Sequence, residues 1–153
     1  MRLSDIVDPK MVWADLTSND KSNVIVELAQ KIASQLPNLT ADDITKVLMN
    51  REQLGSTGIE DGIAIPHAKV PNLEKLVVAC GRSRQGISFD ALDQKPTHLF
   101  FVLLAPEHSA AMHLKILARL SRLLKDKDFR AHIMAAKDAK DIYHIIIEED
   151  TRH

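Results

Sequence analysis

The sequence predicts an α/β domain in which a small mixed β-sheet is flanked by helices. Two observations lead to this fold class. Several segments repeat apolar residues with the period of an α-helix, and several short apolar runs between turn residues are typical of buried strands. The chain has 153 residues, which is enough for one domain with a substantial core. We therefore expect residues 1–153 to form a single domain.

The first part of the chain is predicted to contain one short strand and two helices. Residues 11–13 (Met-Val-Trp) are the candidate strand, and residues 20–36 carry an apolar helical stripe. The second helix is expected to begin at Thr40, a favourable N-cap, and to run to about Leu54, with Gly55 as its C-terminal stop. Its apolar face is predicted to consist of Ile44, Val47, Leu48 and Leu54.

The second half of the chain is predicted to contain further strands followed by three helices. The strand candidates are residues 76–80, 87–90 and 98–104. Residues 109–125 form a helical pattern for which Ser109 is a plausible N-cap. Two closing helices are expected over residues 128–137 and 138–149. The second of these contains the β-branched run Ile145–Ile147, which on its own resembles a strand.

The stretch from residue 51 to residue 70 joins a helix end, a glycine-rich loop, a short apolar run and a histidine. The apolar run, residues 63–65, suits a buried strand. Pro66 cannot donate to a hydrogen-bond ladder, so the strand should stop there and His67 should lie just past its carboxyl end. Open α/β sheets tend to bind ligands at this position, which makes His67 a candidate functional residue.

Two polar residues, Arg51 and His113, fall within otherwise apolar helical stripes. Arg51, in the last turn of its helix, can either reach the helix's own terminal carbonyl groups or point a charge at phosphate oxygens near His67. The pattern alone favours the first interpretation. An inward-facing histidine such as His113 is more often a hydrogen-bonded core residue than a functional one. Near a helix N-terminus, however, an anion is favoured and an imidazolium is disfavoured.

The stretch from residue 51 to residue 70 resembles the active-histidine segment of the fructose/mannitol-type IIA proteins of the bacterial phosphoenolpyruvate:sugar phosphotransferase system. The match is best to the nitrogen-regulatory IIA branch, in which a Gly-Ser-Thr-Gly-Ile loop leads into Ile-Ala-Ile-Pro-His. Residues 87–93 also resemble this branch, so the likeness covers roughly the whole chain. It departs at Glu60, where the family is expected to have a small residue. The resemblance implies a mannitol-type IIA fold, with helices on both sides of the sheet.

The resemblance also implies a function and a set of site residues. His67 is expected to be the phosphorylated nucleophile, with His113, in a His-Leu context, beside it and Arg51 supplying positive charge. Ser56 and Thr57 are candidate phosphate-binding residues, although ordinary turn chemistry explains them equally well. The expected activity is a phosphohistidine relay of the phosphotransferase type that carries a phosphoryl group and needs no cofactor. A phosphohistidine carrier protein is the implied donor, and regulatory targets are the implied partners.

Composition and spacing argue against several other functional classes. A net charge of −1 argues against a dedicated nucleic-acid surface. The glycine loop lacks the Gly-Lys-Ser/Thr of a nucleotide-binding loop, and no Gly-x-Ser-x-Gly motif indicates a hydrolase. No metal is expected, because the histidines show no short ligand spacing. The lone Cys80, the absence of an apolar leader and the absence of a membrane-length apolar run predict a cytoplasmic protein.

Two alternatives to a regulatory phosphocarrier remain open. The first is a sugar-specific IIA component that donates its phosphoryl group to a fructose- or mannitol-type IIB domain. The second belongs to a different class, namely a binding module that has kept the fold but no longer transfers phosphate. Phosphorylation by the upstream components separates the binding module from the two carriers, and transfer to IIB domains separates the two carriers from each other.

Overall fold

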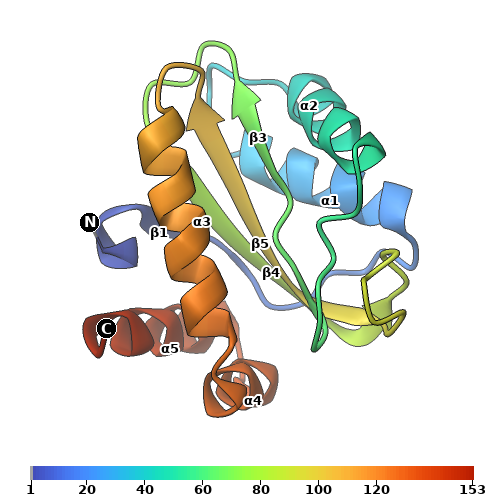
Figure 1. The fold of residues 1–153 in the computed structure, drawn as a ribbon, viewed down its shortest axis with the longest axis vertical. Coiled ribbons are helices and arrows are strands. Elements are labelled where there is room, and N and C mark those ends of the chain that lie inside the picture. The colour runs from blue at the N-terminus through green and yellow to red at the C-terminus, as the bar shows by residue number, and fades with distance from the viewer. Residues whose placement is uncertain (1) are drawn as a thin grey trace.

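The computed structural model describes residues 2–153 and contains one five-stranded mixed sheet (Figure 1). The strands are β1 (Val7–Trp13), β2 (Ile63–Ala64), β3 (His67–Val70), β4 (Val77–Ile87) and β5 (Thr97–Pro106). The sheet order is β1-β4-β5-β2, and β3 pairs with β5 as well. β1 is parallel to β4, β4 is antiparallel to β5, and both β2 and β3 are parallel to β5. The small mixed sheet predicted from the sequence is therefore confirmed.

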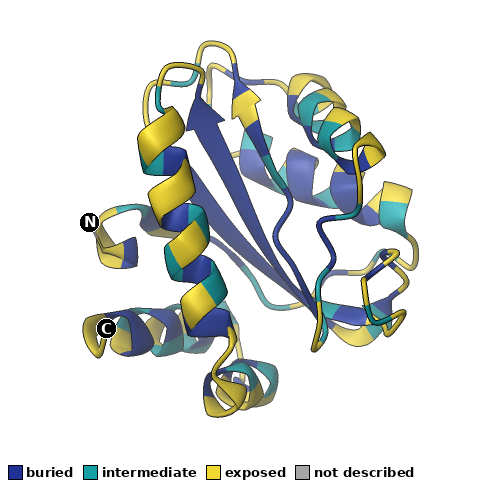
Figure 2. Cartoon of the chain, in the orientation of Figure 1, coloured by how far each residue is buried: buried dark blue, intermediate teal, exposed yellow. Residues whose placement is uncertain are grey.

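Helices cover both faces of the sheet, as predicted. The helices are α1 (Lys21–Ala33), α2 (Ala41–Gln53), α3 (Ala110–Leu124), α4 (Lys127–Ala135) and α5 (Ala139–Thr151), and a short 3₁₀ helix, η1, spans Leu3–Asp5. Successive side chains of a strand point to opposite faces of a sheet. On β5, Phe100 and Val102 pack into the core beneath α1 and α2, whereas Phe101 and Leu103 pack into the core beneath α3, α4 and α5. Figure 2 shows the central strands buried between these two helical layers.

Most helix starts are set by side-chain caps that the sequence makes recognisable. The side chains of Asp20, Thr40, Asp126 and Asp138 each accept a hydrogen bond from a backbone N–H in the first turn of the helix that follows. Ser109 precedes α3 as predicted, but its hydroxyl donates to the Pro106 carbonyl and does not cap the helix. The run Ile145–Ile147 lies within α5, so its helical assignment is confirmed.

The strand stops before Pro66 as predicted, but the chain does not leave the sheet there. β2 ends at Ala64, but pairing with β5 resumes at His67, which lies opposite Leu103. The Pro66 carbonyl accepts a hydrogen bond from the Leu103 N–H at 2.9 Å, so the missing proline N–H interrupts the ladder without ending it. His67 therefore follows the carboxyl end of β2 and at the same time begins a second edge strand.

Two other predictions about local structure are wrong. Residues 87–90 do not form a separate strand, because β4 continues from Val77 to Ile87 with an irregularity between Arg82 and Ile87. Leu54 does not belong to the apolar face of α2, since it lies beyond the last helical residue and the residue is 84% exposed. Glu60 is also exposed, so the departure from the family pattern at this position places a charged side chain in solvent. Within residues 2–153, no helix combines the length and the apolar character needed to span a bilayer.

Candidate functional site

The His67 ring is held by two hydrogen bonds that together define its tautomer. Its Nδ1 lies 2.7 Å from the Ile65 carbonyl oxygen, and the Arg51 Nε–H donates to its Nε2 at 3.3 Å. A carbonyl oxygen can only accept, so Nδ1 must carry the ring proton. Nε2 then holds a lone pair, as the approach of a guanidinium N–H also requires. The half-buried ring therefore presents Nε2 as its nucleophilic atom.

Arg51 contacts His67 and the loop that follows its own helix at the same time. Its Nε contacts His67, while its Nη1 donates to the Gly55 carbonyl oxygen at 2.9 Å. The Gly55 carbonyl belongs to the loop after α2 and is not one of the helix's own terminal carbonyl groups. Different nitrogens of one planar guanidinium thus bind this loop and the His67 ring. The bond to Gly55 fixes the side chain and keeps the guanidinium charge next to the His67 ring.

His113 lies next to His67, although 46 positions separate the two residues in the sequence. The ring centroids are 5.5 Å apart and the ring planes meet at 84°, so one ring presents its edge to the other. His113 is only 9% exposed, and its Nε2 has no hydrogen-bond partner within residues 2–153. An ordinary core histidine would have its buried nitrogens satisfied. A buried imidazole with a free nitrogen beside a second imidazole is better suited to contacting a group that binds between them.

Both histidines have pKa values below the ordinary value of 6.5. Burial is the main cause of the lowered pKa of His67, and the nearby Arg51 lowers it further, against the opposing effects of the Ile65 carbonyl and Glu52. Burial also lowers the pKa of His113, with additional contributions from His67 and Lys69. Both rings are therefore neutral near pH 7, which is the form in which His67 Nε2 can act as a nucleophile.

We expect both rings to remain neutral as the pH falls through 6.5, because burial disfavours their charged forms. The same histidines in the unfolded chain take up protons in that range. The unfolded state then binds more protons than the folded state, so the free energy of unfolding should decrease as the pH falls below 6.5. Ring titrations followed by NMR in the folded protein, with the urea-denatured chain as the control, test this. Midpoints above 6.5 in the folded state would contradict it.

The two candidate phosphate-binding hydroxyls are occupied within the protein. Ser56 Oγ donates to the Phe89 carbonyl oxygen at 2.8 Å and accepts from the Gly58 N–H at 3.0 Å. The hydroxyl and the N–H of Thr57 both donate to the carboxylate of Glu52. Thr57 is also buried, with 5% of its surface exposed. These contacts are those of a structured turn, which was the alternative explanation of both residues.

Glu52 is a charged residue of this region that our sequence reasoning missed. Only 8% of its surface is exposed. Its carboxylate accepts hydrogen bonds from Thr57 and forms an ion pair with Lys21. The sequence did contain a signal, because Ile44, Leu48 and Glu52 are spaced four residues apart and so lie along one face of α2. The Ile65 carbonyl was not recognisable in advance, since its role depends on backbone geometry.

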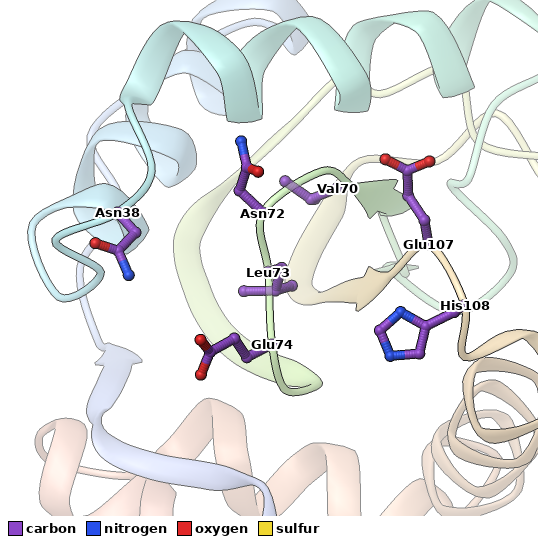
Figure 3. Close-up of a pocket in the computed structure, with 7 residues that line it drawn as sticks. All are labelled: Asn38, Val70, Asn72, Leu73, Glu74, Glu107 and His108. Carbon is purple, nitrogen blue, oxygen red and sulfur yellow. The ribbon is translucent and has the colours of Figure 1, made fainter.

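An open pocket of about 830 Å³ lies beyond the carboxyl end of β3, whereas His67 lies at the beginning of that strand (Figure 3). The side chains that line it come from the end of β3 and from the loops after α1, β3 and β5. They are Asn38, Val70, Asn72, Leu73, Glu74, Glu107 and His108. All five of the polar ones are exposed. Within the described part of the chain, no group of three His, Cys, Asp or Glu side chains is arranged to hold a metal ion.

Comparison with known proteins identifies the family. Residues 5–149 match the family described as phosphoenolpyruvate-dependent sugar phosphotransferase system, EIIA 2. The nitrogen regulatory protein of Bradyrhizobium diazoefficiens is 40% identical over 146 residues, which cover 95% of each protein. The fructose-specific EIIABC component of Bacillus subtilis is 34% identical over 98% of this chain and 24% of its own length.

Solved structures agree with this assignment. The nitrogen regulatory protein IIA-Ntr of Neisseria meningitidis superposes with a TM-score of 0.88 at 30% identity, covering 94% of this chain and 98% of its own. IIA mannitol of Escherichia coli shares the fold, with a TM-score of 0.72 at 14% identity and coverage of 91% and 97%. The mannitol-type IIA fold is thus confirmed. The chain belongs to the EIIA 2 family of the phosphoenolpyruvate-dependent sugar phosphotransferase system and is a phosphocarrier domain similar to the nitrogen regulatory proteins.

Proposed function

We propose that His67 accepts the phosphoryl group at Nε2, from a phosphohistidine carrier protein. The observation that carries this proposal is the pair of hydrogen bonds that leave the proton on Nδ1 and the lone pair on Nε2. In the transfer, the P–N bond of the donor breaks as the new bond to Nε2 forms. The electron pair of the broken bond stays with the donor's imidazole. No cofactor enters this step, because both partners use only side-chain nitrogen.

Arg51 and His113 stabilise the phosphoryl group while it is being transferred. The charge on that group is spread over its three equatorial oxygens, and positioned donors stabilise it. Arg51 already contacts Nε2 through Nε, so a phosphoryl group bound there meets the guanidinium immediately. His113 has a free, buried Nε2 on a ring adjacent to His67. We assign Ser56 and Thr57 to the loop that supports the site, because their hydroxyls are bonded to Phe89 and Glu52.

Similarity to the nitrogen regulatory proteins supports a regulatory role. We infer that residues 1–153 act as one cytoplasmic IIA domain whose contacts with target proteins depend on whether His67 is phosphorylated. The relative from Bradyrhizobium diazoefficiens supports this, since the two proteins match over 95% of both lengths. Incubation with phosphoenolpyruvate, the first enzyme of the system and its carrier protein, followed by intact mass, tests phosphorylation directly. An unchanged mass would favour the alternative of a pure binding module.

A sugar-specific role is the second candidate, and the match to a fructose-specific EIIABC component favours it. We expect the phosphorylated protein to transfer its phosphoryl group slowly or not at all to fructose- or mannitol-type IIB domains. We expect this because the loop of residues 55–67 resembles that of the nitrogen-regulatory IIA branch. The decay of the phosphorylated mass after addition of a purified IIB domain measures the transfer. A sugar-specific IIA domain provides the positive control, and equally fast decay for both proteins would establish the sugar-specific role.

A further inference from the structure

Glu52 is almost completely buried, and its carboxylate makes three polar contacts. Its carboxylate accepts from the Thr57 N–H at 3.0 Å and from the Thr57 hydroxyl, and it pairs with Lys21 Nζ at 2.9 Å. A buried carboxylate is costly unless it is paired and hydrogen-bonded in this way. Glu52 is adjacent in the sequence to Arg51, but it faces the loop that leads to His67.

Backbone hydrogen bonds connect this carboxylate to the His67 ring. Thr57, which is bonded to Glu52, accepts a hydrogen bond on its carbonyl oxygen from the Ile65 N–H at 3.1 Å. The carbonyl oxygen of Ile65 in turn accepts the Nδ1–H of His67 at 2.7 Å. Thr57 and Ile65 are each only 5% exposed, so water does not readily replace these bonds. The position of the carbonyl that defines the His67 tautomer thus depends on the position of Thr57.

A second set of contacts also holds this loop. Lys21 Nζ, besides pairing with Glu52, lies 3.7 Å from Asp90 and 4.7 Å from the centre of the Phe89 ring. Ser56 donates to the Phe89 carbonyl oxygen. The loop also packs closely against this segment, because a Cβ atom on Gly58 would lie 3.1 Å from the Ala91 Cα. Glu52 thus links its own helix, α2, to α1 through Lys21 and to the loop through Thr57.

We propose that Glu52 is a positioning residue for His67, which acts through Thr57 and Ile65 to keep the ring proton on Nδ1 and Nε2 free. This inference rests on the proposed phosphorylation of His67 at Nε2. It extends that proposal by naming the side chain that keeps Nε2 available. The contacts of Glu52 are with Thr57 and Lys21, so beyond the effect of its charge on the His67 pKa it acts on the ring through the loop.

The test compares Glu52→Gln with the wild type by two measurements. Ring ¹⁵N chemical shifts of the unphosphorylated protein report which nitrogen of His67 carries the proton. We expect the wild type to be protonated at Nδ1 and Glu52→Gln to show a mixture of the two tautomers. The rate of phosphoryl acceptance should fall about ten- to a hundredfold, as expected when a reacting group is misplaced slightly.

Three further variants make the result decisive. Glu60→Gln removes an exposed carboxylate from the same loop and should leave the tautomer and the rate unchanged. Thr57→Val removes only the hydroxyl contact to Glu52 and should reproduce part of the Glu52→Gln effect, whereas Thr57→Ser, which keeps a hydroxyl group, should show a smaller effect than Thr57→Val. Thr57→Val also provides the answer if Glu52→Gln does not fold.

The tautomer measurement separates this inference from the proposed function. If the wild type gains no phosphoryl group, the proposed function fails, yet the ring shifts still report whether Glu52 controls the His67 proton. If the tautomer stays at Nδ1 in both Glu52→Gln and Thr57→Val, the positioning role is overturned. A lower melting temperature with an unchanged tautomer and rate would show that Glu52 only stabilises the loop.

Discussion

Replacing His67 with alanine should abolish phosphorylation, because it removes the nitrogen to which the phosphoryl group is proposed to bond. The wild type, incubated with phosphoenolpyruvate, the first enzyme and the carrier protein, should gain one phosphoryl group in intact mass. The His67→Ala protein should gain none. The modification should be lost in acid and survive in alkali, as expected of a phosphorylated imidazole. The ring is half-buried at the start of an edge strand, so the variant should still fold.

His113→Ala is the matched comparison for this experiment, since it removes the other ring of the pair. That protein should still be labelled, although slowly, and its label should map to His67. Phosphate found on His113, or labelling that persists in His67→Ala, would show that His67 is not the nucleophile. Phosphorylation at Nδ1 of His67 would contradict the tautomer that the Ile65 carbonyl implies.

Conservative changes at Arg51 and His113 should slow phosphoryl transfer strongly and leave the fold nearly intact. Arg51→Lys keeps the positive charge but loses the planar fork that contacts His67 and Gly55 simultaneously. His113→Gln keeps much of the size and hydrogen-bonding capacity of the side chain. Removal of one preorganised contact to the moving group costs about 2–4 kcal/mol of barrier, which corresponds to a slowing of about thirty- to a thousandfold.

The measurement is the single-turnover rate of acceptance from the phosphorylated carrier protein, together with the melting temperature of each variant. Both residues lie on helical faces that contact the sheet, so a purely structural role is the competing explanation. It would lower stability by roughly 1 kcal/mol, a typical value for a point mutation, and leave the rate of the folded protein unchanged. Lys115→Met provides a control on α3, since this exposed residue lies two positions from His113. Variants that melt far below the wild type but transfer at its rate would refute the proposed roles.

Local patterns predicted most of the secondary structure because they record which face of each element is buried. The stripes of α1 and α3 and the apolar run of β5 lie where the periodicity placed them. β4 was recognised only in part, because its second half contains Arg82, which is completely buried. The Arg82 guanidinium donates to backbone carbonyl oxygens of Ala14, Ile133 and Ala136. Sequence reasoning treats such a polar residue as a break in a strand, since its partners lie far away along the chain.

The sequence by itself determined the fold class and the family resemblance, and that resemblance made Arg51 and His113 candidate residues beside His67, where the local pattern alone favoured ordinary structural roles. Only the tertiary structure decided that the two rings lie 5.5 Å apart and that Nε2 of His67 is the free nitrogen. It also decided that the hydroxyl groups of Ser56 and Thr57 donate to the Phe89 carbonyl oxygen and to the Glu52 carboxylate. The physical reason is that hydrogen-bond geometry depends on backbone positions set by distant segments. Spacing along the chain predicts which face a residue occupies, but it carries no information about the partner that its polar atoms find.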